Sequence, residues 1–224
     1  MLQFMLSLCE NELSQLDLKI NNTKSVCLRI GKRFDATCCE LKTEIGILPW
    51  KSETRYLGLY LVAATKFKCN FSVAKAKFYR AANSILSKLG SQRNPAVALQ
   101  LISSIAIPIL LYGLETLSLN KTEKLSLEHP WTRIFMKIFS TFDPQIVKLC
   151  QFHCGSQPLV YTIYNRKVSF INNLLFCDNT LLTCLHELNG TDELQEIALN
   201  CNSDRTIFQQ KYSSIISKHF LNSL

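Results

Sequence analysis

The spacing of apolar residues predicts a helix followed by short strands in the first third of the chain. In residues 2–17, the three- and four-residue intervals of an amphipathic helix separate Leu2, Met5, Leu6, Cys9, Leu13 and Leu16. Strands are then predicted at residues 18–20, 25–30, 43–47 and 54–62. The polar residues 21–24 predict a turn, and residues 48–53, which contain Pro49, predict the loop of a hairpin.

Beyond residue 70 the apolar pattern takes on a helical period. Residues 71–89 predict one helix, which Gly90 ends, and Pro95 begins a second. Pro108 should interrupt this second helix near residues 105–107, because proline lacks the backbone donor that a helix needs. Further helices are predicted at residues 129–142, from 143 onward, and at 159–175, 181–188, 192–199 and 206–221.

This order of elements predicts an α+β fold that is mostly α-helical. A helix with short antiparallel strands leads into a region with helices only. We divide the chain into residues 1–62, residues 63–145 and a C-terminal helical region at 146–224, whose role the sequence does not indicate.

The positive charge of the chain is concentrated in one block. No Asp or Glu occurs between Thr54 and Leu114, and that stretch holds Arg55, Lys66, Lys68, Lys75, Lys77, Arg80, Lys88 and Arg93. Outside it, the 17 remaining basic residues equal the 17 acidic residues in number, so the net charge of +8 arises in this block. A local excess of this kind indicates a polyanionic partner, although a solvated helix face that keeps the protein soluble has the same composition.

The helix predicted at residues 71–89 carries half of this block, namely Lys75, Lys77, Arg80 and Lys88. Cations on a helix hold a phosphate backbone without reading its sequence. Phe71 and Phe78 are seven residues apart, which places both on the inner stripe of the helix and in the core. Tyr79 is expected to be exposed, and an exposed aromatic ring can stack on a base or a sugar.

Neither a secretory signal nor a membrane span is predicted. The apolar start of the chain lacks a basic region and a cleavage site, so the ten Cys are expected to be reduced thiols of a cytoplasmic or nuclear protein. Residues 96–117 are long and apolar enough to resemble a membrane span. They contain Gln100 and Glu115, which a bilayer would penalise, and we interpret them as a buried amphipathic helix instead.

The cysteines and histidines do not form a recognisable metal motif. Cys150, His153 and Cys154 lie close together, and Cys177, Cys184 and His186 follow. A zinc site needs close ligand pairs at the spacing of known motifs, and no such combination occurs here. We therefore predict no metal site.

Three segments, in order, resemble a known family. The segment LDLKINNTKS at residues 16–25 resembles motif D of non-LTR retrotransposon reverse transcriptases, where a helix leads into a short strand, an Asn and a Lys-Ser pair. The segments LPW at 48–50 and RYLG at 55–58 resemble motif E, the hairpin that holds the primer end. Lys75 with Phe78, followed by IPILLYG at 107–113, resembles the helical thumb of jockey-like elements.

The resemblance implies roles for individual residues. Lys24 would lie near the incoming triphosphate, where it would neutralise the leaving pyrophosphate or donate a proton to it. The primer grip would be formed by Arg55, Tyr56, Leu57 and Gly58, with Gly58 in a strand that another backbone can approach. Residues 1–62 would belong to a polymerase palm and residues 63–145 to a thumb. The partner would be an RNA or DNA primer–template, with no small-molecule substrate.

The catalytic carboxylates of this family have no counterpart in the chain. Two Mg²⁺ ions in such polymerases are held by an Asp of motif A and an Asp pair of motif C, which precede motif D. No Asp-Asp pair occurs in this sequence, so these residues are expected upstream of Met1, and Mg²⁺ only in the complete polymerase. The isolated chain is expected to be inactive. A non-catalytic nucleic-acid-binding module and a helical interaction protein are the alternatives.

Overall fold

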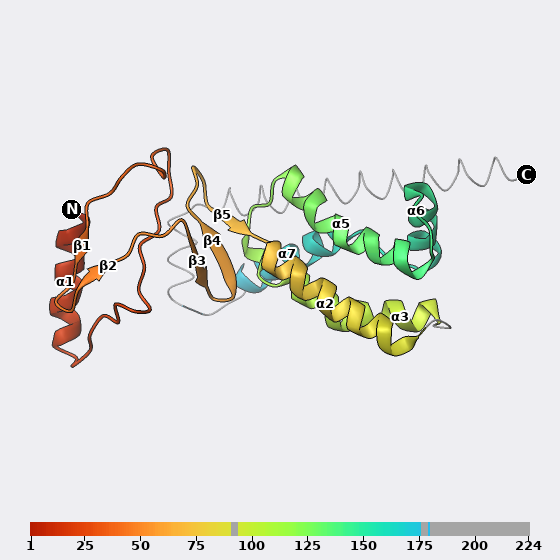
Figure 1. The fold of residues 1–224 in the computed structure, drawn as a ribbon, viewed down its shortest axis with the longest axis horizontal. Coiled ribbons are helices and arrows are strands. Elements are labelled where there is room, and N and C mark those ends of the chain that lie inside the picture. Colours follow the sequence, from red (N-terminus) through yellow and green to blue (C-terminus); the bar gives the residue numbers. More distant parts are fainter. Residues whose placement is uncertain (91–93, 176–178, 180–224) are drawn as a thin grey trace, which may run out of the picture. The chain divides into compact units, whose positions relative to one another are not determined.

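The computed structural model describes residues 1–90, 94–175 and 179 of the chain. They form a mixed, mostly helical α+β structure, which confirms the predicted fold class. The chain divides into two compact units, Met1–Val73 and Ala74–Leu224. The first contains a helix and small antiparallel sheets, and the described part of the second contains only helices (Figure 1).

The first helix, α1, spans Leu2–Ser14, so the helix predicted at residues 2–17 is confirmed but ends three residues earlier. None of its residues is buried, so polar contacts rather than a core attach it to the strand that follows. Gln3 Nε2 donates to the Lys42 carbonyl oxygen at 2.7 Å, and the Lys42 N–H donates to Gln3 Oε1 at 2.9 Å. The side-chain amide of Gln3 therefore pairs with both the N–H and the carbonyl group of Lys42, which lies in an edge strand.

The first hairpin pairs β1 (Leu41–Lys42) with β2 (Ile47–Leu48) in antiparallel register. Its turn occupies residues 43–46, so the strand predicted at 43–47 and the loop predicted at 48–53 are both wrong. The Thr43 N–H donates to the Gly46 carbonyl oxygen at 2.8 Å, and the Gly46 N–H donates to Thr43 Oγ1 at 3.1 Å. The Thr43 hydroxyl therefore helps to close a turn in a stretch whose β-branched composition predicts a strand.

Three strands form the second sheet, in the order β3 (Glu53–Tyr56), β4 (Leu59–Val62) and β5 (Lys68–Asn70). The single strand predicted at 54–62 is therefore a hairpin. Leu57 and Gly58 form its two-residue turn, with φ angles of 46° and 87°. Positive φ at both positions is the geometry of a type I′ turn, which matches the twist of the flanking strands.

The strands predicted at residues 18–20 and 25–30 are wrong, because neither segment joins a ladder. One isolated parallel bridge joins Cys27 to Trp50. The turn predicted at residues 21–24 is confirmed. Asn21 Oδ1 accepts hydrogen bonds from the backbone N–H groups of Thr23, at 3.1 Å, and Lys24, at 3.2 Å. The side chain of Asn21 thus holds the turn that precedes Ser25.

Helix α2 spans Ser72–Leu89 and confirms the helix predicted at 71–89. Its inner stripe buries Phe78, Ala82 and Leu86. Phe71 and Phe78 are both buried, as the sequence predicts. Gly90 follows the helix with a φ of 73°, the left-handed conformation that ends many helices.

The second predicted helix is present, and it is interrupted where Pro108 predicts. Asn94 caps α3 (Pro95–Leu101) by accepting a hydrogen bond from the Ala96 N–H at 2.9 Å. A π-helical turn, η1 (Ile102–Ala106), separates α3 from α4 (Ile107–Leu111). A short 3₁₀ turn, η2 (Leu114–Thr116), follows. Pro108 has no N–H to continue the ladder of an α-helix, and the wider turn before it accommodates this loss.

Helix α5 spans Lys121–Ile138, so the start predicted at residue 129 is wrong. Asn120 and Glu123 form a capping box that begins the helix a little over two turns before Pro130. The Glu123 N–H donates to Asn120 Oδ1 at 2.8 Å, and the Asn120 N–H donates to Glu123 Oε2 at 3.0 Å. The helix also ends before the predicted residue 142, because Ser140 takes a left-handed φ of 51°.

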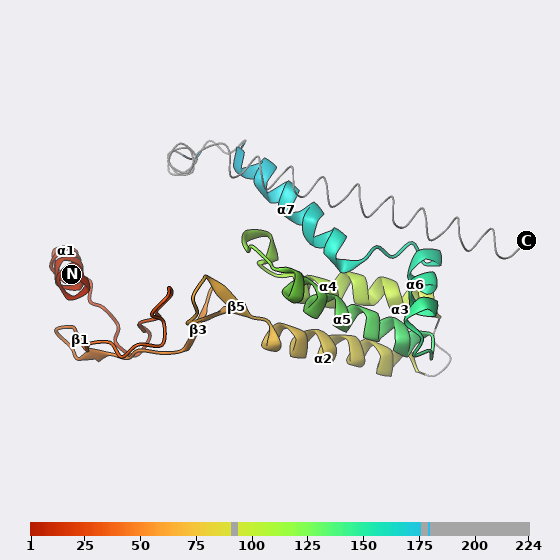
Figure 2. The ribbon, with the colours of Figure 1, turned by 90° about the horizontal axis from the view of Figure 1, so that it is seen from above.

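Helix α5 supplies much of the core of the second unit. Figure 2 shows it between α2 and α7 (Leu159–Leu175), and it contacts both α7 and α6 (Pro144–His153). Its buried side chains are Leu127, Pro130, Trp131, Ile134, Phe135 and Ile138. The predicted helices at Pro144 and at 159–175 are confirmed. Those predicted at 181–188, 192–199 and 206–221 lie outside the described residues.

Candidate nucleic-acid interface

The four residues proposed as a primer grip lie at the tip of the β3–β4 hairpin. Arg55 and Tyr56 end β3, and Leu57 and Gly58 form its turn. All four are exposed, with Tyr56 at 63% and Leu57 at 74%. Gly58 was expected inside a strand, where it would permit a close backbone approach. It instead supplies the positive φ that the turn requires.

Lys24, the residue that resembles the motif D lysine, is exposed at the end of the Asn21 turn. Its N–H donates to the Asn21 carbonyl oxygen at 3.1 Å as well as to the Asn21 side chain. The backbone of Lys24 is therefore fixed while its ammonium group lies at the surface of the first unit.

The cations of α2 separate into two groups in the structure. Lys75 Nζ donates a hydrogen bond to Ser126 Oγ of α5, and Lys75 is half-buried between the two helices. Burial lowers the pKa of the Lys75 ammonium group, because desolvation disfavours its charged form. Lys75 thus contributes to the packing of α2 on α5.

The second group consists of Lys77, Arg80 and Lys88, which are all exposed. At about 100° of rotation per residue, these three side chains fall within roughly 80° of one another around the helix axis. They lie opposite the buried stripe formed by Phe78, Ala82 and Leu86. No acidic residue occurs in α2, so all the charged side chains on this outer face of the helix are positive.

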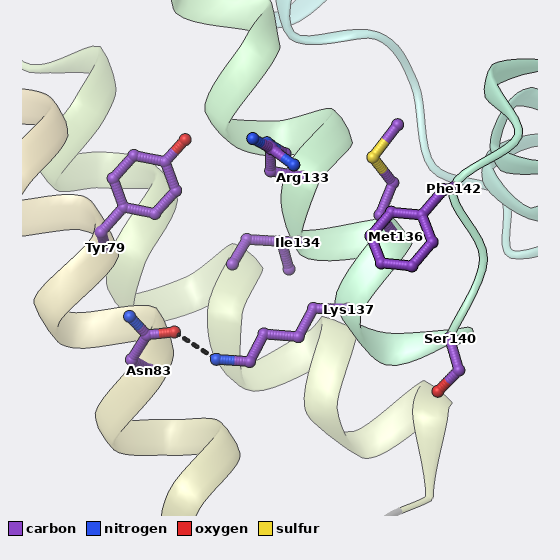
Figure 3. A pocket seen from close by; sticks show the side chains of 8 residues that line it. All are labelled: Tyr79, Asn83, Arg133, Ile134, Met136, Lys137, Ser140 and Phe142. Carbon is purple, nitrogen blue, oxygen red and sulfur yellow. Dashed lines mark hydrogen bonds between the residues drawn. The ribbon is translucent and has the colours of Figure 1, made fainter.

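A pocket of about 530 Å³ lies between α2 and α5. Figure 3 shows its lining side chains: Tyr79, Asn83, Arg133, Ile134, Met136, Lys137, Ser140 and Phe142. Among these described residues two are basic and none is acidic. Ile134 is 2% exposed, while Arg133 and Lys137 are exposed. The pocket therefore combines an apolar floor with a positively charged rim.

Contacts between the two helices hold the polar side chains of this pocket. Lys137 Nζ donates to Asn83 Oδ1 at 2.8 Å across the pocket (Figure 3). Burial raises the pKa of the Tyr79 hydroxyl, and the nearby Arg133 partly offsets that effect. Tyr79 is half-buried, where the sequence predicted an exposed ring.

Sequence reasoning did not single out Arg133 and Lys137. They are four residues apart, so they lie on the same side of α5, next to the buried stripe that contains Ile134. This four-residue spacing of two cations is visible in the sequence, but it indicates a binding site only once α2 is known to pack beside α5. The left-handed Ser140 then turns the chain at the end of α5, and Phe142 follows at the pocket.

A second pocket, of about 370 Å³, has a different character. It is lined by Glu115 and by residues of α7, which are Thr162, Asn165, Arg166, Ser169, Phe170 and Asn173. One carboxylate oxygen of Glu115 is buried and makes no hydrogen bond. A polyanion would meet this carboxylate unfavourably, so the second pocket fits the partner indicated by the charge block less well than the first.

The residues considered as zinc ligands lie at the end of α6. Cys150 and His153 belong to its last turn, and Cys154 follows it. Within the residues that the structure describes, no three His, Cys, Asp or Glu side chains are grouped to hold a metal ion. Cys177, Cys184 and His186 lie outside that part.

The apolar stretch at residues 96–117 forms α3, η1, α4 and η2, and its buried residues include Leu99, Ile102 and Leu110. Across residues 1–90 and 94–175, no helix has the length and apolarity that a bilayer crossing requires. The interpretation of this stretch as a buried amphipathic segment therefore agrees with the structure.

Comparison with known proteins identifies no relative. No protein-family model matches the chain, and neither a curated protein nor a solved structure does so.

Proposed function

We propose that the chain binds the sugar–phosphate backbone of a primer–template through α2, as a non-catalytic part of a reverse transcriptase of the non-LTR retrotransposon kind. The observation that carries the binding proposal is the outer face of α2. Lys77, Arg80 and Lys88 are exposed together there, on a helix that contains no acidic residue.

The reach of this face suits a nucleic-acid backbone. Lys77 and Lys88 are eleven residues apart, which corresponds to about 16 Å along the helix axis at 1.5 Å per residue. A strand of B-DNA advances by about 3.4 Å per phosphate, so this distance covers roughly five phosphates. Charges that are spread along a helix in this way bind the backbone without selecting a base sequence.

The assignment to a reverse transcriptase depends on the resemblance in motif D, motif E and the thumb. The exposure of Lys24 and of the Arg55–Gly58 tip is compatible with contact to nucleic acid. These residues belong to the first unit and α2 to the second, so each surface needs its own test. The absence of an Asp-Asp pair from the sequence leads us to propose binding rather than nucleotide addition as the activity of this chain.

The test compares the binding of a fluorescent primer–template to the full chain and to two triple variants. Replacement of Lys77, Arg80 and Lys88 by Ala should weaken binding at low salt by at least tenfold, because three phosphate contacts are lost. The control replaces Lys121, Lys148 and Arg166, which are exposed cations of α5, α6 and α7, and removes the same charge. Equal binding by the two triple variants would contradict the proposal.

A helical interaction protein is the second candidate, and α1 favours it. Leu2, Phe4, Met5 and Leu8 are all more than half exposed on this helix. Apolar side chains in such an exposed group are typical of a contact with another protein. Stable oligomers without any binding of nucleic acid at low salt would support this candidate over the first.

A further inference from the structure

We propose that the pocket between α2 and α5 binds an unpaired nucleotide of a nucleic-acid strand, with its base against Tyr79 and its phosphate between Arg133 and Lys137. This inference extends the proposed function, since the adjoining duplex would be held by the outer face of α2. It adds a preference for single-stranded nucleic acid that the outer face of α2 would not provide.

The charges of the pocket favour an anion. Arg133 and Lys137 are exposed at its rim, and none of its described lining residues is acidic. A guanidinium group four residues from an ammonium group on the same helix face can contact one phosphate from two directions. The hydrogen bond from Lys137 to Asn83, at 2.8 Å, holds the ammonium group over the pocket before a ligand arrives.

The aromatic side chains favour a planar group beside that anion. Tyr79 meets the fully buried Phe78 edge to face, with ring centroids 5.6 Å apart, so the ring of Tyr79 is supported from within the core. Figure 3 shows Tyr79 and Phe142 on opposite sides of the pocket, with Arg133 and Lys137 between them. A base that stacks on Tyr79 would replace solvent over this ring and over the apolar side chain of Ile134.

The size of the pocket favours one nucleotide over a duplex. Its volume of about 530 Å³ is in the range of small-ligand sites. In a duplex the faces of each base are covered by its neighbours, so stacking on Tyr79 requires an unstacked base. A single-stranded end or a gap provides such a base.

The pocket also continues the basic surface of α2. Asn83 lies three residues after Arg80, which is nearly one helical turn, and it belongs to the rim of the pocket. A strand whose phosphates follow Lys77 and Arg80 would therefore reach the pocket within a short distance. The outer face and the pocket can thus bind successive parts of one strand.

The experiment uses the full chain, a blunt duplex, and the same duplex with a single-stranded thymidine extension that carries one 5-iodouracil. The extension should tighten binding, and irradiation should attach the iodouracil to Tyr79, as mass spectrometry of the peptides would show. Tyr79→Ala should weaken binding of the extended duplex roughly 5- to 150-fold, the effect of losing one base–aromatic stack. Tyr79→Phe keeps the ring and should bind normally.

A second variant leaves the contact between Tyr79 and the buried Phe78 unchanged. Arg133 is exposed, so Arg133→Gln should leave the melting temperature unchanged and weaken binding of the extended duplex alone. Arg166→Gln, on α7, removes the same charge at another exposed position and should bind normally. Free thymidine monophosphate should compete only at far higher concentration than the extended strand.

The results separate the two proposals. Equal affinity for both duplexes, or attachment of the iodouracil to residues outside the pocket, would overturn the inference while leaving binding by α2 intact. Competition by thymidine monophosphate at the concentration of the strand would also overturn it, in favour of a free nucleotide. If the wild-type chain does not bind the blunt duplex but does bind the extended one, the proposed function is contradicted. In that case weaker binding of the extended strand by Tyr79→Ala would still support the pocket.

Discussion

Lys75 donates a hydrogen bond to Ser126 across the contact between α2 and α5, although its neighbour Lys77 lies at the surface. The two lysines are two residues apart, which turns a helix by about 200°, so they cannot share a face. In the sequence both lysines belong to the same positively charged block. The structure separates a lysine that packs between helices from one that is exposed to a partner.

The first prediction concerns Lys75. Lys75→Ala should lower the free energy of unfolding by about 1 kcal/mol, because it removes the hydrogen bond to Ser126 and the packing of the lysine stem. Affinity for a primer–template should change much less than in Lys77→Ala. Chemical denaturation and a binding titration of the two variants measure both effects, and a larger loss of binding in Lys75→Ala would contradict this division.

The second prediction concerns the capping box of α5. Asn120→Ala should cost about 1 kcal/mol of unfolding free energy, because the N–H of Glu123 loses its acceptor at the start of the helix. Asn120→Asp keeps an acceptor at the same place and should be close to wild type. Denaturation in urea measures both variants, and an unchanged stability in Asn120→Ala would show that the box does not hold this end of α5.

The third prediction concerns the pH dependence of stability through Glu128. This residue of α5 accepts a hydrogen bond from the Val160 N–H of α7 at 3.1 Å. Burial raises the pKa of the Glu128 carboxyl, and hydrogen bonds from the backbone of Val160 and Leu159 only partly offset this effect. The folded state therefore holds the proton more tightly than the unfolded chain does, and the contribution of Glu128 to stability is lost as the pH rises through the folded pKa.

Glu128→Gln removes this titration and keeps an acceptor for the Val160 N–H. The free energy of unfolding of the wild type, relative to this variant, should therefore fall as the pH rises from the ordinary carboxyl pKa of about 4.3 towards neutrality. Urea denaturation of both proteins across that range gives the difference directly. A difference that grows with pH would indicate that the pKa of Glu128 is lowered in the folded state.

The fourth prediction concerns the tip of the β3–β4 hairpin. Leu57 has a φ of 46°, which is unfavourable for leucine and common for asparagine. Leu57→Asn should stabilise the hairpin by up to about 1 kcal/mol, and amide hydrogen exchange of Leu61, which pairs with Thr54 of β3, should slow. Faster exchange would show that the exposed leucine side chain contributes more to the hairpin than its backbone conformation costs.

The helical part of the fold could be predicted from local signals. Gly90 and Pro95 mark one end of α2 and the start of α3, and the apolar period of α7 predicts its start at Leu159. Pro130 favours a start of α5 near residue 129, but the capping box at Asn120 is the stronger signal and begins the helix at Lys121.

The strands and the pocket could not be predicted in the same way. Short strands depend on partners, and the segment at 25–30 has β-forming residues but only the bridge at Cys27. The sequence identifies Lys77, Arg80 and Lys88 as part of a basic block. Only the position of the buried stripe of α2 shows that they lie on a different face from Lys75. Arg133 and Lys137 line a pocket only because α5 packs against α2, and no local sequence pattern predicts that packing.

The salt dependence of primer–template binding tests the central claim most directly. If Lys77, Arg80 and Lys88 each neutralise one phosphate, the slope of log K against log salt should fall by about three units when all three are replaced by Ala. The matched variant at Lys121, Lys148 and Arg166 should keep the slope of the wild type. Equal slopes for the wild type and the α2 variant, or an equal fall in both triple variants, would contradict binding through the outer face of α2.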